Sequence, residues 1–180
     1  LERDQIPVIL TTSKTRAEVE ALRLELDNRH PFIIENGAAI YIPKGYFPVK
    51  PEACIEVEDF WIAEFCETRS HWLSLLEKAK ELFTHKFSHF AAMKEEVIAQ
   101  VTGLSLEQAQ LANNREYGEP ISWLGVDKGK QEFIEWLTEQ GGHVLQGGRF
   151  LHLSGFCNKG EALAWLAAEY KTQWNLSEIK

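Results

Sequence analysis

Two short apolar runs on either side of an amphipathic segment constrain the fold of this chain more than any other feature. Ile6–Leu10 and Phe32–Ile34 are apolar throughout, as expected of strands buried on both faces, and such strands are typical of parallel sheets. Between them, residues 16–27 place three apolar side chains on one helical face: Val19, Leu22 and Leu26. The pattern predicts a β-α-β unit, in which ligands bind beyond the carboxyl ends of the strands.

The remainder of the chain alternates helical and strand patterns. Asn36-Gly37 between apolar runs predicts a hairpin. Further helices are expected over residues 70–82, 94–101, 128–140 and 158–170, and strands over 119–124, 143–146 and 150–153. We therefore predict an α/β fold: a partial Rossmann-like parallel-sheet core from residues 1–47 and 154–180, with an inserted α/β cap module, residues 48–153. A module inserted there covers the carboxyl edge of the core, as a lid covers an active site.

Composition narrows the class of protein. The chain has 180 residues, 44% of them hydrophobic, and 19 Lys and Arg against 27 Asp and Glu give a net charge of −8. Such an acidic balance, without a basic stripe, argues against nucleic acid as a partner. No apolar run reaches about 18 residues, so no membrane span is expected. The three cysteines fit no zinc pattern, which favours reduced thiols in a cytoplasmic protein.

The ends suggest a segment of a longer protein. The first residue is Leu, and residues 174–180 stop where an α/β unit normally enters its next strand.

A lysine at the start of a predicted helix indicates a phosphate site. Asn158 and Lys159 open the helix predicted over residues 158–170, and helix N-termini attract anions. A lysine opposes the helix dipole there, at a cost of about 0.3–1 kcal/mol that a nearby anion offsets. Thr12, at the first strand-to-helix junction, is a candidate to hydrogen-bond a phosphate oxygen. Its alternative is an ordinary helix N-cap.

Further residues are candidates for binding the substrate, and for several of them an ordinary structural role is the alternative. Ser13 and Lys14 follow Thr12, although Lys14 also fits a solvated lysine. Asn36 fits either a substrate contact or a simple turn residue. Arg149 follows Gly148, and an arginine suits bidentate binding of a carboxylate or phosphate.

Arg115 is a second arginine candidate. Glu116 and Glu119 beside it are candidate acceptors for sugar hydroxyls, with a helix-terminal ion-pair cluster as the alternative. His85 and His89 are four residues apart, a spacing that suits metal chelation on a helix, but no third ligand stands nearby.

Five motifs in order resemble those of the mannosyl-3-phosphoglycerate phosphatase family, in the branch of the haloacid dehalogenase superfamily with a C2B-type cap. The motifs are Val8–Thr15, Glu35–Ala38, Arg115–Pro120, Gly147–Phe150 and Asn158–Gly160. The resemblance implies a Mg²⁺-dependent phosphomonoesterase that forms an aspartyl-phosphate. Its substrate would be a small phosphorylated sugar acid such as mannosyl-3-phosphoglycerate.

In that family the nucleophilic aspartate precedes the first of these motifs, with an acid-base aspartate two residues later. The metal-binding acidic residues lie in a Gly-Asp-x-x-Asn-Asp-like loop after the last motif. This chain has neither motif, and Asp4 has no Asp-x-Asp partner. The nucleophile and the Mg²⁺ ligands are therefore expected outside these 180 residues, and the chain by itself is expected to be inactive. A non-catalytic module that binds a phosphorylated sugar acid, and a purely structural fragment, are the alternatives.

Overall fold

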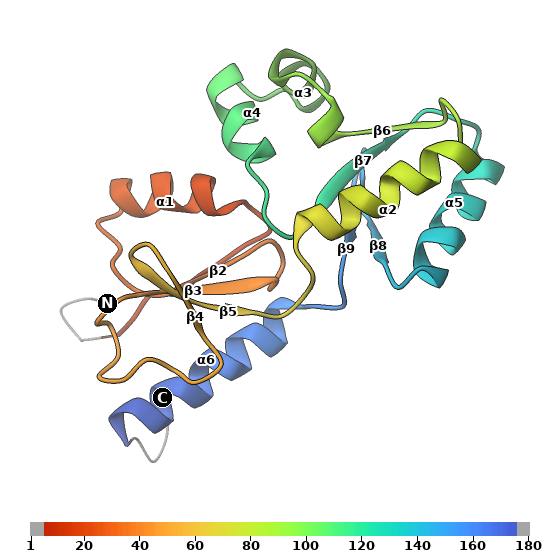
Figure 1. The fold of residues 1–180 in the computed structure, drawn as a ribbon. Coiled ribbons are helices and arrows are strands. Elements are labelled where there is room, and N and C mark those ends of the chain that lie inside the picture. The colour runs from red at the N-terminus through yellow and green to blue at the C-terminus, as the bar shows by residue number, and fades with distance from the viewer. Residues whose placement is uncertain (1–5, 176–180) are drawn as a thin grey trace. The chain divides into compact units, whose positions relative to one another are not determined.

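A computed structural model describes residues 6–175, and Asp4 lies outside that range. The chain divides into two compact units. The first unit combines the residues up to Phe65 with those from Cys157 onward, and the second unit is Cys66–Phe156. Each unit has its own sheet and its own hydrophobic core (Figure 1).

The first unit is built on a five-stranded sheet in the order β1-β2-β3-β5-β4. Its strands are β1 (Leu10–Thr11), β2 (Phe32–Ile34), β3 (Ala39–Pro43), β4 (Ile55–Val57) and β5 (Phe60–Glu64). β1 and β2 pair in parallel, which confirms the β-α-β unit, and the other pairs are antiparallel. The first strand is shorter and less buried than Ile6–Leu10 predicted. Pro7 has no N–H to donate to a neighbouring strand.

Helices α1 (Arg16–Glu25) and α6 (Lys159–Trp174) lie on opposite sides of this sheet (Figure 1). α6 packs Ala162, Leu166 and Tyr170 against a core that includes Ile33 and Ile40.

On α1 only Val19 is buried, whereas Leu22 and Leu26 are exposed, contrary to the predicted apolar face. Arginine side chains cover the aromatic residues on this side of the sheet instead. Arg16 lies over the rings of Tyr41 and Phe60, and Arg23 lies over Phe32.

The first sheet extends further along the chain than the expected boundary at residue 48. β4 and β5 pair with each other, and β5 pairs with β3 from Ala39↔Glu64 to Pro43↔Phe60. Residues 55–64, which we expected in the cap module, therefore belong to the first sheet. All three residues of β4 are exposed, which explains why its pattern carries little strand signal.

The second unit has a four-stranded antiparallel sheet in the order β6-β7-β9-β8. Its strands are β6 (Phe87–His89), β7 (Glu119–Trp123), β8 (His143–Gln146) and β9 (Leu151–Ser154). Its helices are α2 (Arg69–Leu82), η2 (Phe90–Ala92), α3 (Glu95–Thr102), α4 (Leu106–Asn113) and α5 (Asp127–Glu139). α2 and α5 bury their apolar residues against Ile121, Leu151 and Leu153 of the sheet. A smaller core joins Phe90, Ile98 and Ala109 to Phe150.

The two histidines with helical spacing do not share a helix. His85 lies in a turn with a left-handed φ of 58°, and His89 is buried in β6.

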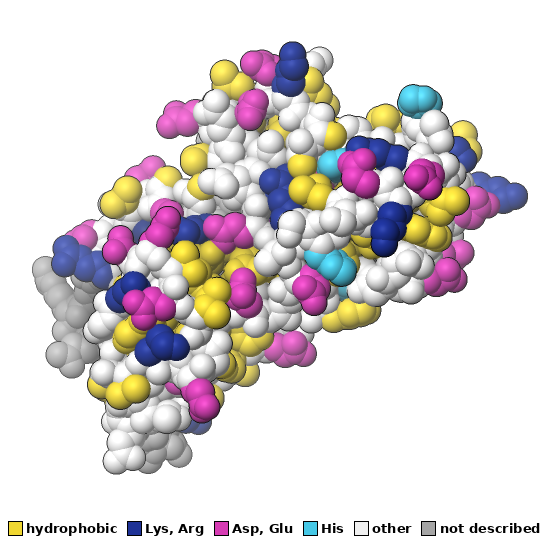
Figure 2. Space-filling view, in the orientation of Figure 1, with side chains coloured by type: hydrophobic (Ala, Val, Ile, Leu, Met, Phe, Trp, Pro, Cys, Tyr) yellow, Lys and Arg dark blue, Asp and Glu magenta, His cyan; other side chains and the backbone are white. Residues whose placement is uncertain are grey.

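On the face seen in Figure 2, Lys and Arg side chains are interspersed with Asp and Glu on each unit. Within residues 6–175 no helix is both long and apolar enough to cross a membrane.

Candidate functional site

Three segments that are distant in sequence meet at the carboxyl ends of β1 and β2. The N–H of Thr12 donates to Ile33 O at 3.1 Å, and the N–H of Asn36 donates to Thr12 O at 2.9 Å. The N–H of Glu35 donates to Lys14 O at 3.0 Å. These bonds join residues 12–14 to the turn after β2, as expected of neighbouring parallel strands.

Gly37 brings the third segment to the same place. Its φ is +99°, and a Cβ there would overlap the carbonyl of Asn158 and lie 2.7 Å from the N of Lys159. Only glycine combines this backbone conformation with so close an approach. The turn after β2 therefore touches the first residue of α6, and Thr12, Asn36, Asn158 and Lys159 lie on one edge of the first unit.

The N-terminus of α6 is well defined. Asn158 is its N-cap, and the Asn158 side-chain oxygen accepts a hydrogen bond from the N–H of Glu161 at 2.9 Å. Lys159 is the first helical residue and is exposed. This edge therefore combines the positive end of a helix dipole with a lysine side chain.

Thr12 does not cap α1. The N-cap is Thr15, whose hydroxyl accepts from the N–H of Glu18 at 3.2 Å while Glu18 accepts from the N–H of Thr15 at 2.9 Å. The alternative interpretation of Thr12 as an N-cap is therefore wrong. Its hydroxyl oxygen accepts from the N–H of Lys14 at 3.2 Å, which leaves the hydroxyl hydrogen able to donate to an anion.

The other candidates at this edge have local roles as well. Lys14 forms an ion pair with Glu18 at 2.6 Å on the surface of α1. Asn36 occupies a left-handed position with φ 64°, as a hairpin turn residue does. Ser13 is exposed in the bend between β1 and α1.

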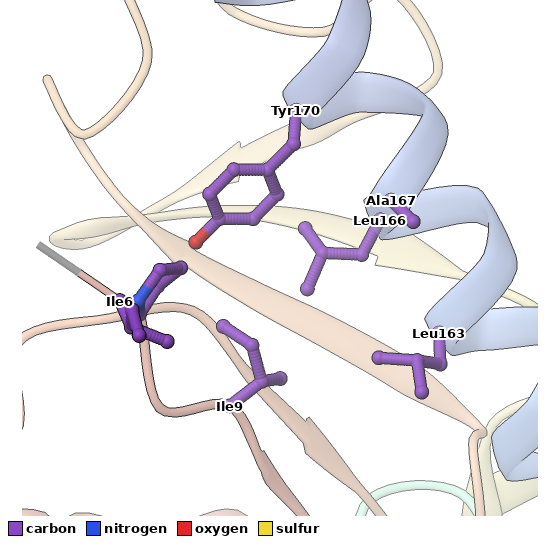
Figure 3. A pocket seen from close by; sticks show the side chains of 7 residues that line it. Ile6, Ile9, Leu163, Leu166, Ala167 and Tyr170 are labelled. Carbon is purple, nitrogen blue, oxygen red and sulfur yellow. The ribbon is translucent and has the colours of Figure 1, made fainter. Parts of the chain in front are cut away.

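An apolar pocket of about 170 Å³ also lies in the first unit, between α6 and the segment leading to β1 (Figure 3). It is lined by Ile6, Pro7, Ile9, Leu163, Leu166, Ala167 and Tyr170. The Tyr170 hydroxyl hydrogen-bonds that of Tyr46 at 2.7 Å, and the rest of the lining is apolar. This pocket has no charged side chain for a phosphate.

Gly148, Arg149 and Arg115 belong to the second unit. Arg149 is exposed and donates to Thr102 O at 3.2 Å, and with Gly148 it lines a pocket of about 180 Å³ that also includes Trp123. Arg115 is half-buried after α4 and donates to Gly118 O at 3.2 Å.

Glu119 is part of a buried ion-pair cluster, which makes it unavailable as an acceptor for sugar hydroxyls. Its carboxylate accepts from Arg69 at 2.5 Å, from the N–H of Ala91 at 2.7 Å, and contacts His89 Nδ1 at 3.0 Å. Burial alone would raise the pKa of Glu119. The hydrogen bonds from His89 and Arg69 and the Arg69 charge outweigh that effect and lower the pKa.

The contacts of Arg69 and His89 with Glu119 were not predicted from the sequence, where His89 was considered only as a metal ligand. Arg69 also donates to Asn113 O and Oδ1, so it fixes the segment that leads to Arg115. The predicted helix began at residue 70, one residue after Arg69, and a position beside a helix does not indicate which partners a side chain meets.

No group of three or more His, Cys, Asp and Glu side chains able to hold a metal ion occurs in the part of the chain that the structure describes. The candidate site at the first unit's edge therefore offers hydroxyl, ammonium and backbone donors, a set that suits an anion.

No family model matches the chain. Several curated proteins are similar to it in sequence. A Methanococcoides burtonii protein named glucosyl-3-phosphoglycerate/mannosyl-3-phosphoglycerate phosphatase is 34% identical over 174 residues, covering 97% of this chain and 64% of that protein. Mannosyl-3-phosphoglycerate phosphatase from Pyrococcus horikoshii is 36% identical, covering 91% of this chain and 65% of that protein. The Pyrococcus furiosus protein of that name is 30% identical, covering 95% of this chain and 68% of its own length.

Solved structures agree on the fold. A haloacid dehalogenase-like hydrolase from Bacillus subtilis superposes with a TM-score of 0.59 at 15% identity, covering 94% of this chain and 69% of that one. A Thermoplasma acidophilum protein gives a TM-score of 0.57 at 16% identity, covering 94% of this chain and 59% of that one. The fold is therefore a mixed α/β fold of the haloacid dehalogenase-like kind, as predicted.

The chain spans 64% of the length of the Methanococcoides burtonii relative and 56% of a Persephonella marina relative that is 34% identical. The sequence similarity nevertheless runs through both units, and the five motifs quoted above fall within the aligned range. The chain belongs to the mannosyl-3-phosphoglycerate phosphatase family.

Proposed function

We propose that the chain supplies the phosphate-binding edge and the substrate-recognition unit of a phosphatase acting on mannosyl-3-phosphoglycerate or a related sugar phosphoglycerate. The observation that supports this most is the meeting of Thr12, the Asn36-Gly37 turn and Lys159 within the first unit. The names of the curated relatives support the substrate class.

Each residue at this edge has a role that follows from its chemistry. Phosphoryl transfer depends mainly on positioning and charge stabilisation. The Lys159 ammonium and the N-terminus of α6 would neutralise the phosphoryl oxygens, and the Thr12 hydroxyl would donate to one of them. Ser13, Lys14 and Asn36 would complete the surroundings of the phosphate. Asn158 would hold the first turn of α6 in place.

The covalent step uses groups outside these 180 residues. An aspartate carboxylate would form the bond to phosphorus while the ester oxygen leaves, and water would then cleave the aspartyl-phosphate. The proposal includes Mg²⁺, which would supply further charge stabilisation, with ligands outside the described residues.

The second unit would recognise the sugar-acid part of the substrate. Arg149 and Arg115 carry guanidinium groups, which bind carboxylates in bidentate fashion, and the lack of a side chain at Gly148 would permit close approach.

Phosphate release by the complete gene product tests the proposal. Mannosyl- and glucosyl-3-phosphoglycerate would be assayed with magnesium and with a chelator, and release only with magnesium is expected. Binding of either ester without phosphate release would favour a non-catalytic binding module instead.

Lys159→Ala is expected to lower turnover at least tenfold, because a charge beside the transferring oxygens is lost while the exposed position tolerates alanine. Circular dichroism would verify folding. Lys171→Ala, in the last turn of the same helix, is the matched control and should retain full turnover. Wild-type turnover in Lys159→Ala would remove Lys159 from the mechanism.

A further inference from the structure

One face of the second sheet is left free of the core formed with α2 and α5. Ile121, Leu151 and Leu153 point into that core. Side chains alternate along a strand, so His152 points to the opposite face. There it lies opposite Pro120 of β7 and Leu145 of β8. His152 is half-buried, whereas the residues before and after it in β9, Leu151 and Leu153, are fully buried.

A glycine makes room for the His152 ring. A Cβ on Gly147 would lie 2.9 Å from His152 Nε2 and 3.0 Å from Cδ2. Gly147 does not have a left-handed φ, so its backbone conformation does not itself require glycine. Glycine at residue 147 therefore leaves space for the His152 ring. The Nε2 edge of that ring lies against the loop that carries Arg149.

The surroundings of His152 set its protonation. Burial lowers the pKa of His152, and the positive charge of Arg115 lowers it further. The imidazole is therefore neutral near pH 7, with one nitrogen that donates and one that accepts.

We infer that His152 is a substrate-contacting residue of the second unit that hydrogen-bonds a hydroxyl of the sugar ring. The inference rests on the proposed function and deepens it. A neutral imidazole matches a hydroxyl, because each both donates and accepts. It adds little for an anion, which the arginines bind better. His152 thereby distinguishes the sugar from the rest of the substrate.

Two substrates separate these contributions in the complete gene product. One is mannosyl-3-phosphoglycerate, and the other is an analogue in which a methyl ether replaces the sugar but the carboxylate and phosphate remain. His152→Phe keeps a ring of similar size without its hydrogen bonds. It should raise KM for the sugar ester about three- to tenfold, the factor expected of one hydrogen bond, and leave the analogue unchanged. His152→Gln should restore part of the loss.

Gly147→Ala gives an independent measurement, because the added methyl displaces the ring while His152 itself remains. It should raise KM for the sugar ester in the wild-type background and have no further effect in His152→Phe. His85→Asn, at an exposed left-handed turn position that asparagine tolerates, is the control and should behave as wild type.

Equal changes for both substrates in His152→Phe, or no change for either, would overturn the assignment of His152 while leaving the phosphatase proposal intact. Phosphate release from neither substrate by the wild-type protein would overturn the proposed function and this inference with it.

Discussion

Arg149 is positioned by a hydrogen bond to the backbone and otherwise lies open to solvent. Its guanidinium gives one hydrogen bond to Thr102 O, and the side chain is exposed, so its other N–H groups are oriented without being buried. Lys14, by contrast, already pairs with Glu18. A guanidinium offers two parallel donors to a carboxylate, which a lysine does not.

Arg149→Ala is therefore expected to raise KM for phosphoglycerate esters at least tenfold and to change KM for an aryl phosphate, which has no carboxylate, by less than twofold. Arg149→Lys should recover only part of the loss, because it keeps the charge but not the bidentate geometry. Steady-state kinetics on both substrates provides the measurement. Similar effects on the two would show that Arg149 does not recognise the glycerate end.

The turn between β2 and β3 contacts the start of α6, and the candidate site depends on this contact. Gly37 lies against the first residues of α6, and its φ is +99°. Gly45 also has a left-handed φ, +77°, but nothing lies within 4 Å of a Cβ built there. A substitution at Gly45 therefore measures backbone strain alone, whereas one at Gly37 measures strain together with the close contact with α6.

Gly45→Ala should cost about 1–2 kcal/mol of unfolding free energy, the penalty of a left-handed alanine, and leave turnover unchanged. Gly37→Ala should cost more and also lower turnover, because the methyl group pushes away the start of α6 and with it Lys159. Urea unfolding and phosphate release on both variants check this. Equal effects of the two substitutions would mean that the contact with α6 does not matter.

Elements with strong local signals were predictable from the sequence. The capping box at Ser105 and Gln108 and the left-handed Gly103 after α3 are signals of this kind, since caps depend on neighbouring residues alone. β4, β5 and β6 were missed. β4 and β6 have three residues each and, unlike the wholly apolar β2, lack a continuous apolar run, and β5 lies in a segment that we assigned to the cap module. A pattern of period 2 needs more residues than that to be recognised.

The candidate site was predictable to the extent that it lies at strand and helix ends. Thr12 and Lys159 follow from such positions, and the structure places both segments at one edge of the first unit. The cluster around Glu119 was not predictable, because its partners Arg69 and His89 come from separate elements. Sequence order carries no information on which carboxylate a distant arginine meets.

At the scale of the whole molecule, each unit has its own core, and only the second unit buries the Glu119 cluster. The folded-state pKa of Glu119 lies below its ordinary value of 4.5. Its contribution to stability is therefore fully present above about pH 4.5 and is lost as the pH falls through the lower, folded-state pKa.

Urea unfolding at pH 7 and at pH 3 would measure this. The wild-type second unit should lose stability on acidification. Arg69→Met should cost about 3–5 kcal/mol at pH 7, since it leaves a buried carboxylate without its main cation, and should lose less on acidification. Lys80→Met removes the exposed Lys80–Glu77 pair instead and should cost under about 1 kcal/mol. An Arg69→Met variant as stable as Lys80→Met would show that the cluster does not stabilise the unit.

The ends of the second unit lie beside each other: a Cβ on Gly155 would lie 2.6 Å from Cys66 Cβ. α6, which covers the first sheet, follows the second unit in the chain and is therefore synthesised after it. Once the second unit has folded, the two ends of its roughly ninety residues lie close together. The entropy cost of bringing α6 back to β2 and β3 is then that of closing a short loop. The order of synthesis thus favours completing the second unit first and the edge that carries Thr12 and Lys159 last.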